Sequence, residues 1–390
     1  MIDFDLSPDQ VALREAVGRL ADEVYRPKAI EWDHNSTPLP DPERRRLAEL
    51  GYLGMALPEE FGGGGSELLD ALIVIEELAK RSQTAAFQVF EACTGAARVI
   101  DLFGTRESKA RFLPSIAAGQ KTMAVAISEP DAGSAATDLS TTARLDGDTY
   151  VVNGVKRWCS GAGHAEQYLV YVRLSDARGS RGIGALVVDA GASGLRFGPQ
   201  EKLMGFHGIP SADIYLDEVR VDRDNLIVDV GGFGKLFSAF SIERLGNSTM
   251  CLAIGQTCLD RTARYIQERK QFGRPIVEFQ LVQGALADMV MQVEAARLLV
   301  YRAAARAGHG APVPLEASMA KCFSNDMAKR VSDLALQLHG GYGYSIEYEI
   351  ERLHRDAHGW ALGGGTGNIQ RSRIAAEYLG RRFDQRAQRD

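Results

Sequence analysis

A glutamate on a long helical segment is the residue in this sequence best suited to acid–base chemistry. Segment 234–270 has helical periodicity, and at about 100° per residue four apolar side chains lie within about 60° of Glu243 on the helical wheel: Leu236, Phe240, Met250 and Ile254. A carboxylate on an apolar stripe loses hydration, and a raised pKa makes it a candidate general base. The alternative is structural, a glutamate that extends to solvent or pairs with Arg244.

Two glycine clusters near helix ends could bring backbone N–H groups close to an anionic ligand. Residues 340–343 (GGYG) follow one helical segment, and residues 363–367 (GGGTG) precede the last. Glycine permits a close approach, and helix N-termini favour anions such as a pyrophosphate. Neither cluster follows a strand, so neither is a Rossmann fingerprint, and the alternative for each is a helix cap or a turn.

An aromatic and a hydroxyl residue follow a predicted strand and its Asn-Gly turn. Trp158 and Ser160 lie in the segment 156–160 (KRWCS). The flat indole could contact a planar cofactor, and the alternative is a tryptophan in the core of a β domain.

The sequence lacks the residue patterns of several other enzyme chemistries. The seven histidines show no metal-binding spacing such as HExxH, and neither a GxSxG nor a Walker sequence is present. The five cysteines include no CxxC pair, so we expect buried, reduced thiols. These observations predict no metal site, and they disfavour a serine hydrolase or a P-loop nucleotidase.

The composition is that of a soluble globular protein, with 45% hydrophobic and 25% charged residues in 390 positions. The 41 glycines exceed the roughly 27 expected from average usage, but proline is not raised, which excludes a collagen-like chain. The net charge of −6 argues against nucleic acid as a partner. No apolar run approaches the ~20 residues of a membrane span, and the N-terminus shows no signal-peptide pattern, so we expect a cytoplasmic protein.

The predicted secondary structure that positions these residues changes twice along the chain, from helices to strands and back to helices. Residues 1–119 read as helices, and the first has a serine cap at Ser7 with a capping-box Gln10. Residues 120–230 contain short β-branched and aromatic runs separated by turn residues, which indicates an antiparallel β domain. Residues 231–390 return to long helical patterns, which suggest a four-helix bundle formed by segments 234–270, 277–308, 315–338 and 366–381. The predicted fold class is α+β, with three domains in the order α, β, α.

Five motifs occur in the order and with the spacing of one enzyme family. They are 127–134 (ISEPDAGS), 153–160 (NGVKRWCS), 268–273 (ERKQFG) with 279–283 (FQLVQ), 337–344 (QLHGGYGY) and 365–371 (GTGNIQR). From end to end the chain resembles the acyl-CoA dehydrogenase family of flavoproteins. The resemblance implies FAD and oxidation of an acyl thioester between Cα and Cβ.

The resemblance also implies roles for individual positions. It places three residues on the isoalloxazine ring: Ser128, Trp158 and Ser160. It places seven residues around the adenosine and pyrophosphate of FAD: Arg269, Phe272, Gln280, Gln337, Gly341, Thr366 and Asn368. Segment 268–273 would reach the FAD of a partner subunit. It places four residues on the substrate side: Ser134, Ser241, Arg244 and Gly365. Of these, Ser134 would lie near the thioester arm and Arg244 near the catalytic carboxylate.

The position of the catalytic base departs from one branch of the family. Short- and medium-chain members place a glutamate just before the Gly-Thr pair, where this chain has Gly364. A subgroup that includes isovaleryl-type, long-chain-type and prolyl-carrier-protein oxidase-type enzymes places it before the helix arginine, which here is Glu243. Gly364 keeps its backbone N–H and can still donate to the thioester oxygen, as the family's backbone does together with the FAD ribityl hydroxyl.

The sequence therefore predicts Cα proton removal by Glu243 and hydride transfer from Cβ to flavin N5. One alternative is a flavin oxidase or biosynthetic dehydrogenase acting on a carrier-protein-bound acyl group. Another is a non-catalytic binding protein with the same fold. The implied partners are coenzyme A or a carrier protein, an electron-transfer flavoprotein or oxygen as electron acceptor, and other copies of the chain in a homotetramer.

Overall fold

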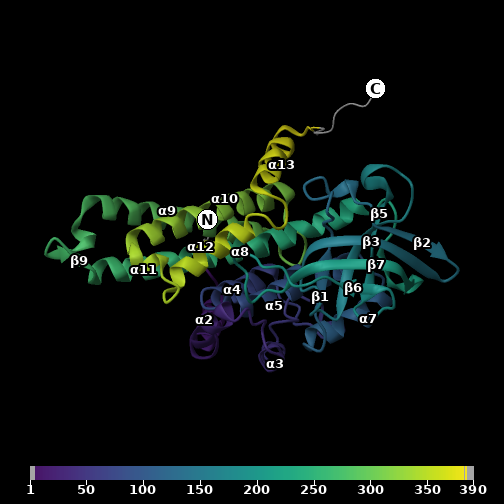
Figure 1. Cartoon of the computed structure of the whole chain (residues 1–390), viewed down its shortest axis with the longest axis horizontal. Helices are drawn as coiled ribbons and strands as arrows, with labels where there is room; N and C mark the ends of the chain where they lie inside the picture. Colours follow the sequence, from purple (N-terminus) through teal and green to yellow (C-terminus); the bar gives the residue numbers. More distant parts are fainter. Residues whose placement is uncertain (1–4, 382, 384–390) are drawn as a thin grey trace.

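The computed structural model describes residues 5–381 and 383 and begins with a helical layer (Figure 1). The first helix has the predicted cap, because Ser7 accepts from the Gln10 backbone and the Gln10 side chain accepts from the Ser7 N–H. The elements of this layer are α1 Pro8–Leu20, η1 Ala21–Tyr25, α2 Arg26–His34, α3 Asp41–Glu49, η2 Glu59–Phe61, α4 Leu68–Ala79, α5 Gln83–Thr94, α6 Ala96–Phe103 and α7 Arg106–Ala117.

The middle of the chain forms one eight-stranded sheet with the order β6-β7-β3-β2-β4-β5-β8, with β1 paired to β4. Most pairs are antiparallel, as predicted, but β1 runs parallel to β4, with Met123 opposite Gln167. The pairing of β1 was not predicted because a short apolar run does not reveal its direction. The strands are β1 Met123–Ala126, β2 Thr142–Asp146, β3 Thr149–Ser160, β4 Gln167–Arg173, β5 Ile183–Asp189, β6 Leu195–Phe197, β7 Ser211–Asp222 and β8 Leu226–Val228. Three 3₁₀ turns accompany them, η3 Ala136–Asp138, η4 Gly179–Gly182 and η5 Arg223–Asn225.

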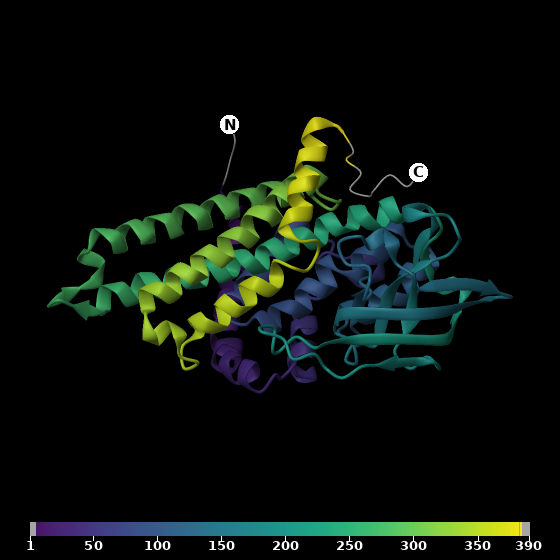
Figure 2. The same ribbon diagram turned by 45° about the horizontal axis from the view of Figure 1, so that its top comes forward.

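Long helices make up the last part of the chain and extend away from the sheet (Figures 1 and 2). The four predicted helices are present as α8 Phe233–Glu268, α9 Gln280–Ala307, α10 Pro314–His339 and α13 Gly367–Leu379. The shorter α12, Glu349–Trp360, lies alongside α8 and α10, whereas α13 is steeply inclined to the bundle (Figure 2). The remaining elements are β9 Lys270–Gln271, β10 Arg274–Pro275, η6 Ile276–Glu278 and α11 Gly341–Tyr344.

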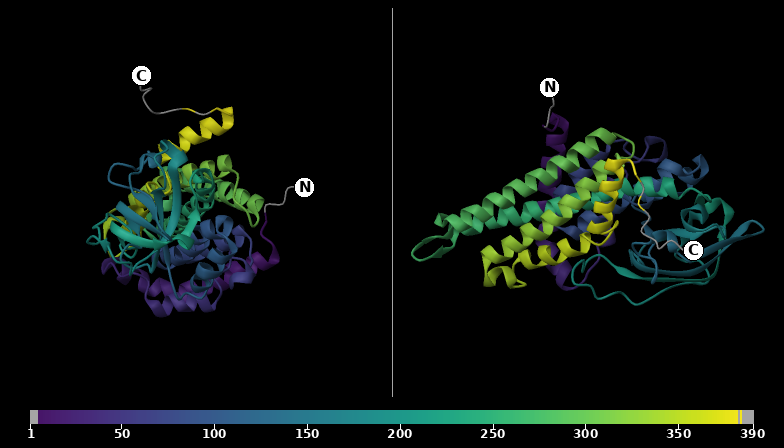
Figure 3. Two further views of the ribbon diagram at one scale, coloured as in Figure 1. Left: turned by 90° about the vertical axis from the view of Figure 1, so that its right-hand side faces the viewer. Right: turned by 90° about the horizontal axis from the view of Figure 1, so that it is seen from above.

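The N-terminal helical layer, the sheet and the start of the bundle meet around one apolar core. Figure 3 shows the backbone of these three parts from one end and from above. Helix α8 crosses α5 very closely at Gly246, where an added Cβ would lie 2.5 Å from Thr94 Oγ1 and 2.7 Å from Phe90 Cδ2. A side chain at position 246 would push the two helices apart. The close crossing holds the part of α8 that carries Glu243 against the face of α5.

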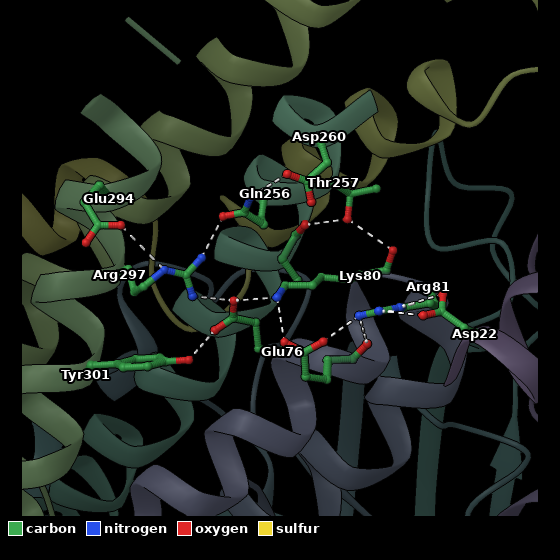
Figure 4. Close-up of polar contacts among 12 residues, drawn as sticks. Asp22, Glu76, Lys80, Arg81, Gln256, Thr257, Asp260, Glu294, Arg297 and Tyr301 are labelled. Carbon is green, nitrogen blue, oxygen red and sulfur yellow. Dashed lines mark hydrogen bonds and ion pairs between the residues drawn. The ribbon is translucent and has the colours of Figure 1, made fainter. Parts of the chain in front are cut away.

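A buried ion-pair network joins α4 to the bundle (Figure 4). The Glu76 carboxylate accepts from Arg297 Nη1 at 2.5 Å and from Tyr301 Oη at 2.7 Å, and Lys80 Nζ lies 3.3 Å away. Burial alone would raise the pKa of Glu76, but Lys80, Arg297 and the hydrogen bonds lower it to about 2. A buried carboxylate keeps its charge at low cost when it is paired in this way. The network therefore depends on residues more than 200 positions apart.

The described residues show neither a membrane-spanning helix nor a cluster of metal ligands. No helix among them is long and apolar enough to cross a bilayer. Within the same residues, no group of three or more histidine, cysteine, aspartate or glutamate side chains could hold a metal ion.

Candidate active site

Five of the residues predicted to form the site line a single cavity of about 200 Å³: Ser128, Trp158, Ser160, Glu243 and Gly364. They come from the loop after β1, from β3, from α8 and from the loop between α12 and α13. The remaining walls come from β1, β3, α5, α8, α12 and the segment before β7, and they include five aromatic side chains: Phe87, Phe90, Phe206, Phe240 and Trp360. The cavity thus lies where all three parts of the chain meet.

Glu243 is the ionisable group that α8 presents to this cavity. Its Oε2 atom is buried and has no hydrogen-bond partner among the described residues. Burial raises the pKa of this carboxyl, and the positive charges of Lys321 and Arg244 oppose the shift only in part. A carboxylate without a partner and with a raised pKa can accept a proton from a weak acid.

Gly364 lies directly against the Glu243 carboxyl. Its φ is +66°, and a Cβ added there would lie 2.7 Å from Glu243 Oε2 and 3.0 Å from Oε1. The carboxyl of Glu243 therefore occupies space that a side chain at position 364 would need. The Gly364 N–H has no acceptor among the residues described, which leaves a free donor beside the carboxyl.

The loop that carries Gly364 is held by buried polar side chains on three helices. Asn247 Nδ2 donates to Trp360 O at 3.0 Å, and Lys321 Nζ donates to Gly365 O at 2.9 Å. Gln370 Nε2 lies 3.1 Å from both the Gly364 and the Gly365 carbonyl oxygens. These bonds use the carbonyl oxygens of the loop and leave the N–H of Gly364 free.

Arg244 is buried beside this loop and not in the cavity wall. Its Nε donates to Gly364 O at 3.4 Å, and its guanidinium lies 4.9 Å from the centre of the Phe237 ring. Burial, together with the nearby Arg373, lowers the pKa of Arg244 to about 10, so it remains a cation at neutral pH. Arg244 thus lies next to Gly364, one residue along α8 from Glu243.

The wall formed by β3 presents an indole that is about half exposed. Trp158 has φ +60° and is 52% exposed, and the Arg157 guanidinium covers it at 4.2 Å from a ring centre. The pairing of β3 with β7 is irregular between Lys156 and Cys159, which turns Trp158 out of the regular strand. A strained residue with a large exposed ring at a cavity is what a planar ligand would cover.

A buried ion pair fixes the neighbouring turn that carries Ser128. Lys156 Nζ donates to Glu129 Oε1 at 2.8 Å and to Ile127 O at 3.1 Å, and the Arg157 N–H donates to Ser128 O at 2.8 Å. The carboxylate of Glu129 also accepts from the backbone N–H groups of Ser140 and Thr141. Ser128 is therefore held on a rigid turn beside β3.

The residues predicted for the other end of the cofactor lie far away in the same chain. Glu243 and Glu268 are 25 positions apart on α8, a distance of about 38 Å at 1.5 Å per residue. Arg269 follows there, and its guanidinium lies 5.7 Å from the centre of the Tyr342 ring in α11. The structure gathers five predicted residues at this end of the bundle: Arg269, Phe272, Gln280, Gln337 and Gly341. One chain does not bring them to the cavity.

The other predicted residues have varied surroundings. Thr366 caps α13, where its side chain accepts from the Ile369 N–H at 3.5 Å, and Asn368 is exposed in the first turn of that helix. Ser241 is fully buried on α8, and its Oγ has no partner among the described residues. Ser134 is exposed in the loop before η3 and does not line the cavity.

Two functional candidates were missed by sequence reasoning. Lys321 on α10 is fully buried next to Gly365, and burial lowers its pKa to about 8. Glu91 on α5 lines the cavity and carries a buried oxygen without a partner among the residues described. A carboxylate on an apolar stripe was the signal that identified Glu243, but no such stripe marks Glu91, because α5 is buried on nearly all sides.

Comparison with known proteins identifies the class of this fold and site. Family models of the N-terminal, middle and C-terminal domains of acyl-CoA dehydrogenase match residues 7–120, 124–219 and 231–379. The chain belongs to the acyl-CoA dehydrogenase family.

Individual relatives span nearly the whole chain. Glutaryl-CoA dehydrogenase of Desulfococcus multivorans is 35% identical over 97% of this chain and 98% of its own length. The caffeyl-CoA reductase-Etf complex subunit CarC of Acetobacterium woodii is 35% identical over 86% of this chain and 88% of its own length. The solved prolyl acyl carrier protein oxidase AnaB has a TM-score of 0.91 at 26% identity and covers 96% of this chain and 100% of its own. The protein is a FAD-dependent oxidoreductase that dehydrogenates acyl thioesters.

Proposed function

We propose that Glu243 is the base that removes the Cα proton of the acyl thioester. The observation that carries this proposal is the place of its carboxyl, which lies against Gly364 in the cavity wall and whose buried Oε2 has no hydrogen-bond partner among the described residues. The Gly364 N–H beside it is the donor we assign to the thioester carbonyl oxygen. A donor aimed at the developing enolate oxygen lowers the energy needed to remove the neighbouring proton.

Binding of the acyl group in the cavity would displace water from the Glu243 carboxyl. Loss of hydration raises the pKa of the carboxyl further and brings it closer to that of the activated Cα–H. Burial raises the pKa of Glu243, and the positive charges of Lys321 and Arg244 on the far side of the loop favour its ionised form. These two cations hold the carboxylate and the loop in place and do not contact the cavity.

The residues present suit FAD at the exposed face of Trp158. Ser128, Trp158 and Ser160 would hold the ring system, and Thr366 and Asn368 lie at the N-terminus of α13, where anions are favoured. FAD, when bound, supplies the acceptor for the hydride that leaves Cβ. We propose that the remaining contacts come from Arg269, Phe272, Gln280, Gln337 and Gly341 of a neighbouring chain.

This division of the cofactor site supports a homo-oligomer, for which we propose a tetramer. Phe272 is 93% exposed and Leu281 is 90% exposed at the far end of the bundle, where apolar side chains would be covered by another copy. All five cysteines are free and buried, which supports a cytoplasmic location.

We propose an electron-transfer flavoprotein as the acceptor of the electrons, since the relative CarC is named as part of such a complex. The carrier of the acyl group is coenzyme A in this proposal. The likeness to AnaB supports a second candidate, an oxidase acting on a carrier-bound acyl group. Mixing the reduced protein with oxygen separates the two, because fast reoxidation supports the oxidase.

The variant Glu243→Gln tests the base. It keeps the volume and polarity of the side chain but cannot take the proton, so FAD should stay bound while flavin bleaching by a reactive acyl thioester is lost. Anaerobic stopped-flow absorbance measures the bleaching, and Asp260→Asn on the far half of α8 is the matched control. Bleaching within tenfold of the wild-type rate would show that Glu243 is not the base.

A further inference from the structure

A second carboxyl faces the active-site cavity and has no role in the proposed proton transfer. Glu91 lies on α5 between Phe87, one turn earlier, and Gly95, and all three residues line the cavity. Glu91 and Phe87 also line a neighbouring cavity of about 110 Å³ that reaches the exposed Asp41 and the buried Arg44 of α3. Glu91 therefore lies at the end of the active-site cavity, between it and the next one.

The Glu91 carboxyl has neither a positive charge beside it nor a hydrogen-bond partner for its buried oxygen among the described residues. Its Oε2 is buried and has no partner among the described residues, and no positive charge acts on it. Burial and the charge of Glu243 raise its pKa to about 8, so Glu91 is a neutral acid at pH 7 and can donate a hydrogen bond. A buried polar group of this kind is stable in a cavity only with water or a polar ligand beside it.

The walls next to Glu91 are aromatic. The Trp360 ring lies 5.3 Å from the Phe90 ring and 4.9 Å from the Phe206 ring, both edge-on, and its Nε1 is already used by Gln83 Oε1 at 3.0 Å. These rings offer apolar contact to an acyl group and no further hydrogen bond. Glu91 is then the polar group that the distal end of a bound acyl chain meets.

We propose that Glu91 determines specificity by donating a hydrogen bond to a neutral oxygen at the distal end of the acyl group. The preferred substrates are then acyl thioesters with a hydroxyl or carbonyl group remote from the thioester. The inference rests on the proposed function of the cavity. An anionic end is disfavoured because Glu243 shares the cavity, and a plain alkyl end would displace water and leave Glu91 without a partner.

The size of the effect follows from the cost of an unsatisfied buried group. Leaving a buried donor unpaired lowers affinity by roughly tenfold or more, and sites built to bind a hydroxyl reject analogues without it. An acyl group that ends in oxygen should therefore bind at least about tenfold more tightly than its alkyl counterpart. The preference should depend on residue 91 and on no other residue of α5.

Matched pairs of coenzyme A thioesters test the inference: pentanoyl with 5-hydroxypentanoyl, and 3-phenylpropanoyl with 3-(4-hydroxyphenyl)propanoyl. Affinity is measured from the flavin absorbance change on binding to FAD-loaded protein with the Glu243→Gln substitution, so the result does not require turnover. In that background we compare Glu91→Leu, Glu91→Gln and Gln88→Leu. Gln88 lies on the same helix and lines only the neighbouring cavity, which makes it the control.

We expect the hydroxylated member of at least one pair to bind at least tenfold more tightly. Glu91→Leu should remove this ratio, while Glu91→Gln, which can still donate, and the control should keep it. A general effect of Glu91 on folding or on Glu243 would change both members of a pair equally and leave the ratio intact. Equal affinities in both pairs, a ratio that survives Glu91→Leu, or tighter binding of 5-aminopentanoyl-CoA would overturn the inference. Failure of the base assignment would instead show as bleaching by Glu243→Gln.

Discussion

The contact between Gly364 and Glu243 makes the substitution Gly364→Ala a direct test of the site. The added Cβ would lie 2.7 Å from one carboxylate oxygen and 3.0 Å from the other, whereas ordinary contacts begin at 3.4 Å. The carboxyl must therefore retreat by about 0.7 Å. Alanine at φ +66° also costs about 1 kcal/mol of backbone strain, which a large protein tolerates.

A displacement of this size should slow flavin reduction by between about 10- and 100-fold, because misplacing a reacting group by 1 Å can cost about 10² in rate. FAD content and the unfolding midpoint should remain close to wild type. The assay is the rate of flavin bleaching after anaerobic mixing with a reactive thioester.

Gly363→Ala is the matched control for this measurement. An added Cβ there meets nothing within 4 Å, so the neighbouring substitution should leave the rate unchanged. If Gly364→Ala reduces flavin within twofold of wild type, the carboxyl does not need its present position and the reasoning fails.

Three further predictions concern the stability and reactivity of the protein. Arg297→Met leaves Glu76 buried with too little positive charge and should cost about 3–5 kcal/mol in denaturant unfolding, while the exposed pair broken by Arg330→Met should cost at most about 1 kcal/mol. The pKa values of Asp22 and Glu76 are lowered to about 2 in the folded protein, so their contribution to the free energy of unfolding is complete above pH 5 and is lost as the pH falls toward 2. A free energy of unfolding that stays constant over this pH range would contradict the pairing. The five cysteines are buried, so Ellman's reagent should label them only after unfolding, and rapid labelling of the native protein would disprove their burial.

Apolar residues at helical spacing predicted the long helices. The stripe around Glu243 stands out in the sequence because the other faces of this part of α8 carry polar residues, such as Asn247, Ser248 and Thr249, although these are buried as well. The role of Glu243 as the base stays a prediction. Helix α5 is buried on nearly all sides, so no stripe distinguishes the face that carries Glu91. The polar residues near Glu91 in the sequence do not indicate that a cavity lies beside it.

Long-range contacts account for most of what the sequence did not reveal. Glu243 and Gly364 are 121 positions apart, and no local pattern shows that one occupies the space of the other. Strands β2, β6 and β8 escaped prediction because they are short or mostly polar, and their pairing partners define them more than their composition does. The predicted domain boundaries near 119 and 230 stay predictions.

The Glu76 network has a consequence for building chimeras from members of this family. Glu76 belongs to the segment that the sequence marks as the first domain, and its partners Arg297 and Tyr301 belong to the third. If the first domain is replaced by that of a relative, the relative's residue occupies position 76. If that residue does not pair with Arg297 and Tyr301, an unbalanced charge is buried between α4 and α9. Grafts of this region should therefore transfer positions 76, 297 and 301 as a set, although more than 220 residues separate the first from the others.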